Sequence, residues 1–112
     1  MTFDKPGVAD LLSLLNREPQ TLQGALVADK MVGKAAAVLL VLGMVGEVYA
    51  DVISTPAREF LDDHQIPVTF SQEVPFVMNR QKDGLCPMEQ LAFREFNPKR
   101  IKEKIEEFIN QR

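Results

Sequence analysis

The stretch of residues 47–70 constrains the fold of this chain most strongly, because two predicted strands flank one short helix. Residues Glu47–Ile53 (EVYADVI) alternate in polarity and are rich in Val, Ile and Tyr, which predicts a strand. Ser54-Thr55-Pro56 then supplies a cap and an early helical proline, and the helix is expected to run to about Gln65. Ile66–Phe70 (IPVTF) is the next predicted strand. A strand–helix–strand unit this compact is normally a right-handed parallel crossover, so the segment predicts an α/β sheet.

The other predicted elements are mostly helical. A first helix has apolar residues at 3.6-residue spacing and ends at Pro19. The apolar stretch Leu22–Val27, interrupted by Gly24, indicates either a short strand or a tight approach to the next element. We interpret Asp29 as the cap of a central helix in which residues 35–42 are apolar on every side, so this helix should be buried among several neighbours. Asn97-Pro98 begins a terminal helix with one apolar face.

Length and composition favour one ordinary globular domain. The chain has 112 residues, 46% hydrophobic and 26% charged, so we expect a single domain over residues 1–112. A net charge of −3 favours neither nucleic acid nor an anionic membrane as a partner. The longest apolar stretch, residues 35–45, is too short to span a bilayer. Cys86 is the single cysteine and no leader-like segment is recognised, so the expected location is cytoplasmic.

One candidate binding site lies at the predicted start of the central helix. Lys30 and Lys34 are four residues apart and would share a helical face, where the helix amides and dipole already favour an anion. Together with Asp29 they predict a phosphate or carboxylate site. The alternative, in which Asp29 caps the helix and both lysines are solvated, is equally consistent with the sequence.

A second candidate cluster contains Asn79, Arg80, Cys86 and Glu89. A cysteine at a helix start has a stabilised thiolate, so Cys86 is a candidate nucleophile or redox sensor. His64 is the only histidine and is predicted near a helix end at the surface, so no base is identified and a ligand-lining or structural Cys86 is favoured. We therefore assign no catalytic residue. One Cys and one His cannot supply a zinc site, and we expect no metal or cofactor.

Three segments together resemble a known family. They read VADKMVGKAAAVLL, ISTPAREFLDDHQIPVTF and NRQKDGLCPMEQ, and the resemblance to domain of unknown function 1893 covers residues 7–95. This family is assigned to the cytidine deaminase-like fold. The resemblance implies a three-layer α/β/α arrangement around a mixed sheet, and it implies no known activity.

The residues that would bind zinc in deaminases are replaced here. Zinc deaminases open the central helix with H-x-E and the next helix with P-C-x-x-C. The corresponding positions read Ala28-Asp29-Lys30 and Pro56-Ala57-Arg58-Glu59-Phe60, so only Pro56 matches. Without the zinc ligands no metal-bound water is activated, and we reject classical deamination. The former zinc pocket would still be lined by Asp29, Lys30 and Lys34, with Asn79, Arg80, Cys86 and Glu89 as additions.

The resemblance also bears on assembly and function. Family members usually carry an N-terminal β-hairpin that is missing here, so either the start is truncated or a sheet edge is exposed, and we expect a homodimer or larger oligomer. The leading hypothesis is a non-catalytic domain that binds a small anionic or nucleotide-like molecule. The alternatives are a metal-free enzyme using Cys86, which rapid alkylation blocked by a ligand would favour, and a structural or partner-binding protein.

Overall fold

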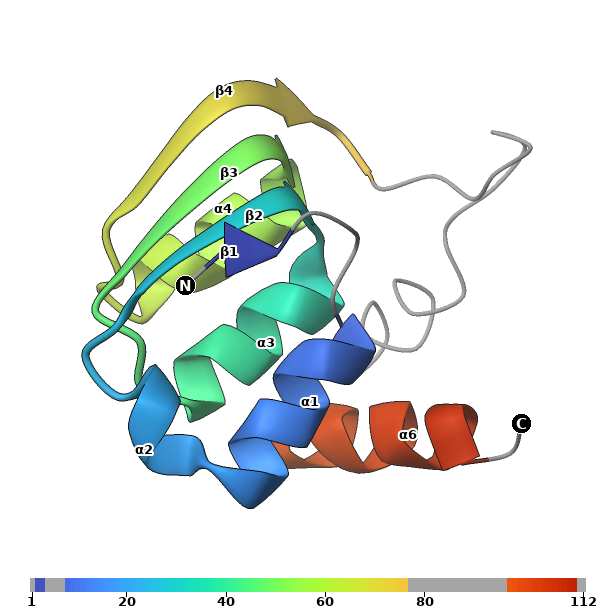
Figure 1. The fold of residues 1–112 in the computed structure, drawn as a ribbon. Helices are drawn as coiled ribbons and strands as arrows, with labels where there is room; N and C mark the ends of the chain where they lie inside the picture. Colours follow the sequence, from blue (N-terminus) through green and yellow to red (C-terminus); the bar gives the residue numbers. More distant parts are fainter. Residues whose placement is uncertain (1, 4–7, 77–96, 111–112) are drawn as a thin grey trace.

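The described part of the chain forms a parallel sheet with helices packed against it (Figure 1). The computed structural model describes residues 2–3, 8–76 and 97–110. The sheet has four strands in the order β1-β2-β3-β4, and β1 contributes only two residues. In chain order the elements are β1 (Thr2–Phe3), α1 (Val8–Arg17), α2 (Pro19–Leu22), β2 (Leu26–Val32), α3 (Lys34–Leu42), β3 (Glu47–Ser54), α4 (Thr55–Asp63), β4 (Val68–Val74) and α6 (Pro98–Asn110).

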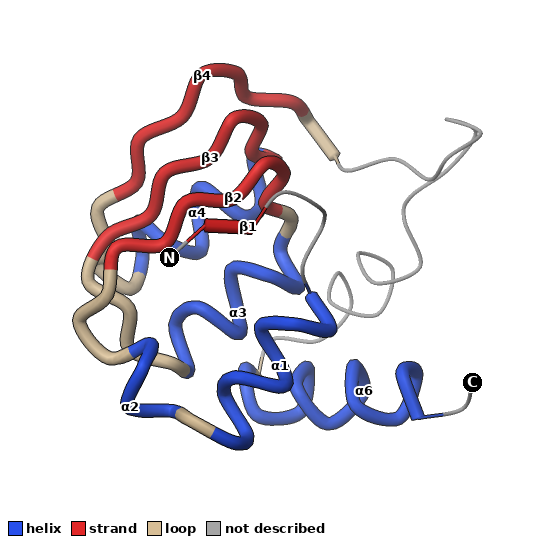
Figure 2. Tube along the Cα trace, viewed as in Figure 1, coloured by secondary structure: helices blue, strands red, loops and turns tan. Residues whose placement is uncertain are grey.

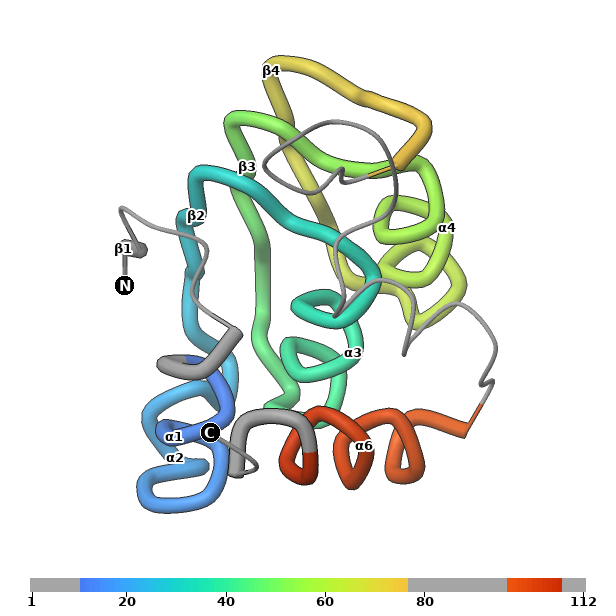
Figure 3. Tube along the Cα trace, turned by 90° about the vertical axis from the view of Figure 1, so that its right-hand side faces the viewer, coloured from blue at the N-terminus to red at the C-terminus, as the bar shows by residue number. Residues whose placement is uncertain are grey.

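Each strand pairs in parallel with its neighbour in the chain. Val27 lies opposite Val48, and Val48 lies opposite Val68. When consecutive parallel strands are joined by right-handed crossovers in one direction, every connecting helix falls on the same face of the sheet. Figures 1 and 3 show α3 and α4 on one side, and α1 and α6 pack against α3.

The strand–helix–strand unit predicted for residues 47–70 is confirmed. The hydroxyl of Ser54 accepts a hydrogen bond from the Ala57 amide at 3.2 Å, which caps α4 as expected, and α4 ends at Asp63. Strand β4 begins at Val68, two residues beyond the predicted start at Ile66. The terminal helix α6 is also confirmed.

The predicted start of the central helix is wrong. Strand β2 continues through Asp29 and Lys30 to Val32, and α3 begins only at Lys34, after the extended residue Gly33 (Figure 2). Residues 26–32 form a strand because they pair with β1 on one side and β3 on the other. The expectation of a buried central helix is confirmed, since residues 35–40 of α3 are all buried.

The mixed α/β class is confirmed, but the described residues do not form three layers. Their sheet is parallel throughout, and the helices that join its strands lie on one face. In the central strand β3, Val48 and Ala50 are buried, whereas Glu47, Tyr49 and Asp51 are exposed. A parallel sheet covered on both faces has nearly continuous apolar strands, so the alternation over residues 47–51 places this part of one face against solvent. Farther along the same face, Val32 and Ile53 are fully buried. Across the described residues, no helix combines the length and apolar character needed to cross a membrane.

Candidate functional site

The most unusual polar residue in the described chain is Asp29, in the middle of β2. Its side chain is 3% exposed. It shares the helix-covered face of the sheet with Val27 and with Ala50, which lies opposite it on β3. The Lys30 amide donates a hydrogen bond of 2.7 Å to Asp29 Oδ1.

The second carboxyl oxygen of Asp29, Oδ2, is buried and has no hydrogen-bond partner among the residues that the structure describes. Burial raises the pKa of Asp29 to about 6, and the backbone amides of Lys30 and Met31 act on this pKa in the opposite direction. An unsatisfied buried oxygen costs roughly 1–3 kcal/mol and calls for an explanation. Asp29 is therefore the strongest candidate for a polar contact with a ligand.

The start of α3 lies beyond the carboxyl end of β2. Lys34 is its first residue and is half-buried, and Gly33 has no side chain with which to cap the helix. The neighbouring helix α4 also begins at this edge of the sheet, but Ser54 caps it. Ligands of parallel α/β sheets bind outside the carboxyl ends of the strands, and helix starts favour anions.

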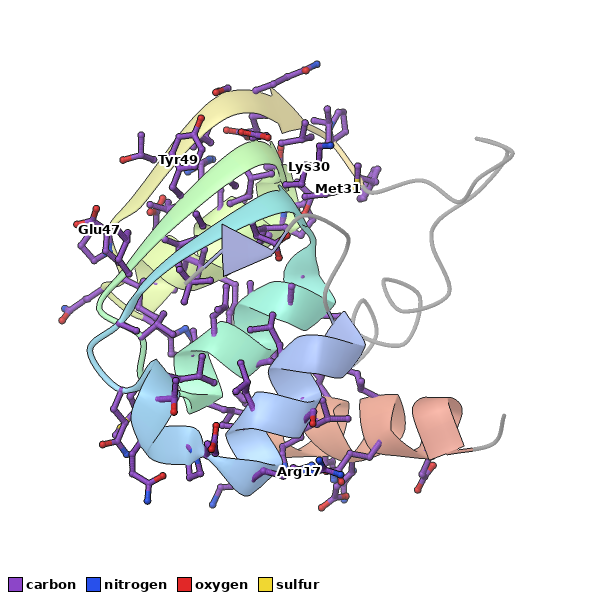
Figure 4. All side chains as sticks on the ribbon, viewed as in Figure 1. Arg17, Lys30, Met31, Glu47 and Tyr49 are labelled. Carbon is purple, nitrogen blue, oxygen red and sulfur yellow. The ribbon has the colours of Figure 1, made fainter. Side chains whose placement is uncertain are left out.

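Lys30 lies in β2 and shares no helical face with Lys34. Residues 30–32 are extended, so successive side chains point to opposite faces and the predicted helical pairing of Lys30 with Lys34 is wrong. Lys30 is exposed and, with Tyr49, lies on the side of the sheet away from α1 and α6 (Figure 4). The structure therefore corrects the helical pairing of Lys30 with Lys34, and the role of each of these residues in binding stays a prediction.

The second predicted cluster is not tested by the structure. Asn79, Arg80, Cys86 and Glu89 lie outside the described residues, so their role in a site stays a prediction, as does the enzyme hypothesis based on Cys86. His64 is confirmed as a surface residue at a helix end. It is the C-cap of α4, and its Nδ1 lies 2.9 Å from the Phe60 carbonyl oxygen.

The helix start that the sequence comparison set against the deaminase H-x-E motif is also corrected. Because α3 begins at Lys34, the helix start reads Gly33-Lys34-Ala35 rather than Ala28-Asp29-Lys30, and it too lacks a His or Cys. On α4, Ala57 is fully buried. Within the described ranges, no group of three His, Cys, Asp or Glu side chains could hold a metal ion.

Sequence reasoning missed a polar cluster that joins α4 to β4. Arg58 Nε lies 2.7 Å from Glu73 Oε1, and the Thr55 hydroxyl donates to Glu73 Oε2 at 2.7 Å. The Thr55 hydrogen bond and the Arg58 guanidinium hold the pKa of Glu73 below its usual value. Arg58 also pairs with Asp62 at 2.8 Å, and only this i,i+4 pair could have been found from the sequence.

Two shallow hollows lie elsewhere on the helical side of the molecule. One is lined by Ser13, Leu14, Arg17 and Glu18. The other is lined by Leu15, Leu42, Lys99, Lys102 and Glu103. Neither contains a residue of the predicted sites.

Comparison with known proteins identifies a family but no activity. Residues 1–109 match the family described as TM1506, domain of unknown function (DUF1893). The fold is similar to the crystal structure of a DUF1893 family protein (TM1506) from Thermotoga maritima, with 32% sequence identity and a TM-score of 0.82. The match covers 90% of this chain and 68% of that one. A comparison with curated proteins gives no match. The chain therefore belongs to the family of domain of unknown function 1893.

Proposed function

We propose that this domain binds a small nucleotide-like molecule at the carboxyl edge of its sheet. In this proposal an anionic group of the ligand lies at the start of α3 beside Lys34, and a polar N–H group of the ligand donates to Asp29. The observation that carries the proposal is the buried Oδ2 atom of Asp29, which has no hydrogen-bond partner in the described part of the chain. The cytidine deaminase-like fold is retained only as part of the proposal.

The spacing of the two groups favours a ligand longer than a simple phosphate. Asp29 and Gly33 are four residues apart along extended chain, so at about 3.3 Å per residue their α-carbons are separated by roughly 13 Å. A single phosphate cannot contact both ends of this stretch. A molecule that carries its anionic group at one end and an N–H donor at the other could do so.

The ionisation of Asp29 defines what the ligand must offer. With a pKa of about 6, this carboxyl group is mostly ionised at neutral pH and accepts hydrogen bonds without donating them. The complementary ligand group is therefore an N–H donor such as an exocyclic amine or a protonated ring nitrogen. Hydrogen bonds to a charged acceptor are among the stronger ones, so this contact would contribute to selectivity as well as affinity.

The proposal is tested by thermal shift with nucleosides, nucleoside monophosphates and inorganic phosphate. A ligand present at 100 times its dissociation constant stabilises the folded state by about 2.7 kcal/mol. We expect a nucleoside monophosphate to raise the melting temperature more than either the nucleoside or phosphate alone. Lys34→Ala should reduce the difference in melting temperature between samples with the nucleoside monophosphate and samples with the nucleoside. Asp29→Asn should reduce the shift caused by compounds that carry an exocyclic amine.

The matched control is Lys30→Ala, which removes an exposed lysine on the opposite face of the sheet. Its ligand-induced shift should equal that of the wild-type chain. The proposal fails if none of the three compound classes shifts the melting temperature. It also fails if Lys30→Ala abolishes a shift that both Lys34→Ala and Asp29→Asn retain.

A further inference from the structure

The face of the sheet opposite the described helices carries a mixture of charged, aromatic and aliphatic side chains. We refer to this surface as the open face and define it by six residues of β2 and β3: Leu26, Ala28, Lys30, Glu47, Tyr49 and Asp51. Leu26 is 53% exposed and Tyr49 is 37% exposed. Parallel sheets are almost always covered on both faces, so an open face with exposed apolar groups needs a covering partner or a reason to lack one.

The open face is uneven because a large side chain on β3 lies beside a small side chain on β2. Ala28 and Tyr49 lie opposite each other in the β2–β3 register. The hydroxyls of Tyr49 and Ser71 are 2.9 Å apart, so the ring of Tyr49 leans toward β4 and away from Ala28. The result is a raised position on β3 and a low position on β2 at the same level of the sheet.

The two strands of the open face also carry opposite charges at one level of the sheet. Asp29 pairs with Ala50 and Met31 with Val52, so Lys30 and Asp51 stand at the same level between them. Lys30 is on β2 and Asp51 is on β3. Within the part of the chain that the structure describes, neither of these side chains forms an ion pair.

Because of these differences in side-chain size and charge, the open face of one copy is complementary to the open face of a second copy. A two-fold axis that runs along the strands between β2 and β3 exchanges the two strands while keeping each level unchanged. Two Lys30–Asp51 pairs then form between the copies. Ala28 of each copy lies opposite Tyr49 of the other, whose ring leans past Ala28 toward the β1 side. At the remaining level Leu26 meets the methylene groups of Glu47.

We propose that a second copy of this chain docks on the open face through this two-fold arrangement. The proposal is independent of the proposed ligand site, which lies on the helix-covered side of β2. It also differs from pairing at a sheet edge, because it uses side chains of the sheet face and leaves the edges free. An interface of this kind is isologous, so it closes as a dimer and does not extend into a filament.

The size of the surface predicts a weak, reversible dimer. The six residues lie on two strands about 4.8 Å apart and span about five residues of each, which gives a face of roughly 10 by 17 Å. This is below the area buried by standard stable interfaces. We therefore expect self-association to depend on protein concentration, and to weaken as salt screens the Lys30–Asp51 contacts.

Charge reversal followed by mixing tests the arrangement. Lys30→Asp sets a carboxylate opposite Asp51 of the second copy, and Asp51→Lys sets an ammonium group opposite Lys30 of the second copy. Each reversal is repeated by the two-fold axis, so each variant alone should self-associate at least about tenfold more weakly than the wild type in sedimentation equilibrium. An equimolar mixture of the two variants should associate again, because the paired copies then carry opposite charges: the two carboxylates of one variant face the two ammonium groups of the other.

Controls separate the interface from effects on folding. Far-UV circular dichroism checks that each variant is folded, and Lys30→Ser with Asp51→Ser provides a milder pair if a reversal prevents folding. Glu107→Lys changes an exposed charge on α6 and should leave association unchanged. A wild-type chain that stays monomeric at every accessible concentration would overturn the proposal. So would folded single variants that associate like the wild type, or a mixture of the two reversals that remains monomeric.

Discussion

At the scale of single residues, Asp29 links stability to pH. Burial raises its pKa in the folded chain from 3.8 to about 6, so the folded state holds a proton more tightly than the unfolded state. The contribution of Asp29 to stability is therefore greatest below pH 4. It is lost between about pH 4 and pH 6, and the folded state is less stable above that range. The change is on the order of 2–3 kcal/mol.

We expect Asp29→Asn to remove this dependence. The difference in unfolding free energy between Asp29→Asn and the wild type, measured by urea denaturation, should shift in favour of the variant as the pH rises from about 4 to about 6. Asp63→Asn, at an exposed position, serves as the control and should show no such change across this range. A constant difference for Asp29→Asn would show that the carboxyl group is not held in an unfavourable environment.

The sequence identified Asp29 as important but assigned it the wrong role. Asp followed by Lys and apolar residues is equally compatible with a helix cap and with a strand that ends before Gly33. Asp29 lies in a strand because it pairs with Phe3 on β1 and with Ala50 on β3. Both partners are far away in the sequence, so local propensity does not predict this pairing. Lys34 was expected one turn inside a helix capped by Asp29, whereas it is the first residue of α3.

At the scale of secondary-structure elements, α4 depends on its cap. The side chain of Ser54 is fully buried and accepts the Ala57 amide, which would otherwise lack a partner at the helix start. We expect Ser54→Ala to lower the free energy of unfolding by about 1 kcal/mol or more, measured by urea denaturation. Ser13→Ala, at an exposed position in α1, is the control. Equal stability of the two variants would show that the cap does not stabilise α4.

The alternation of β3 contained a signal that the family resemblance obscured. Glu47, Tyr49 and Asp51 occur at every second position, and this pattern predicts a strand with one face in solvent. The resemblance instead implied helices on both faces. The local pattern describes these residues better, because a strand buried on both sides would have to place two carboxylates in the core.

At the scale of the whole molecule, α6 and the sheet are expected to unfold together. Ile101 and Ile105 are fully buried and α6 packs on α3, which in turn lies beside the sheet. We predict that Ile101→Ala lowers stability by roughly 2–5 kcal/mol. Tyr49 is the only tyrosine and the chain has no tryptophan, so Tyr49 fluorescence reports on the sheet while far-UV circular dichroism reports mainly on the helices.

Both probes should shift to the same lower midpoint in Ile101→Ala, because a single domain unfolds as one cooperative unit. The conservative variant Ile101→Val should shift both midpoints less. Separate transitions for fluorescence and circular dichroism would contradict the prediction that residues 1–112 form one domain.

The order of the strands has a consequence for how the chain can assemble during synthesis. Each of β2, β3 and β4 pairs with the strand made just before it, so every new strand emerges when its partner is already present. No strand has to wait for a distant one, which keeps contact order low for a parallel sheet. The exception is α6, whose isoleucines cover α3 and arrive last. Until α6 is present, the side of α3 that it covers stays exposed, so this helix completes the core of the described fold.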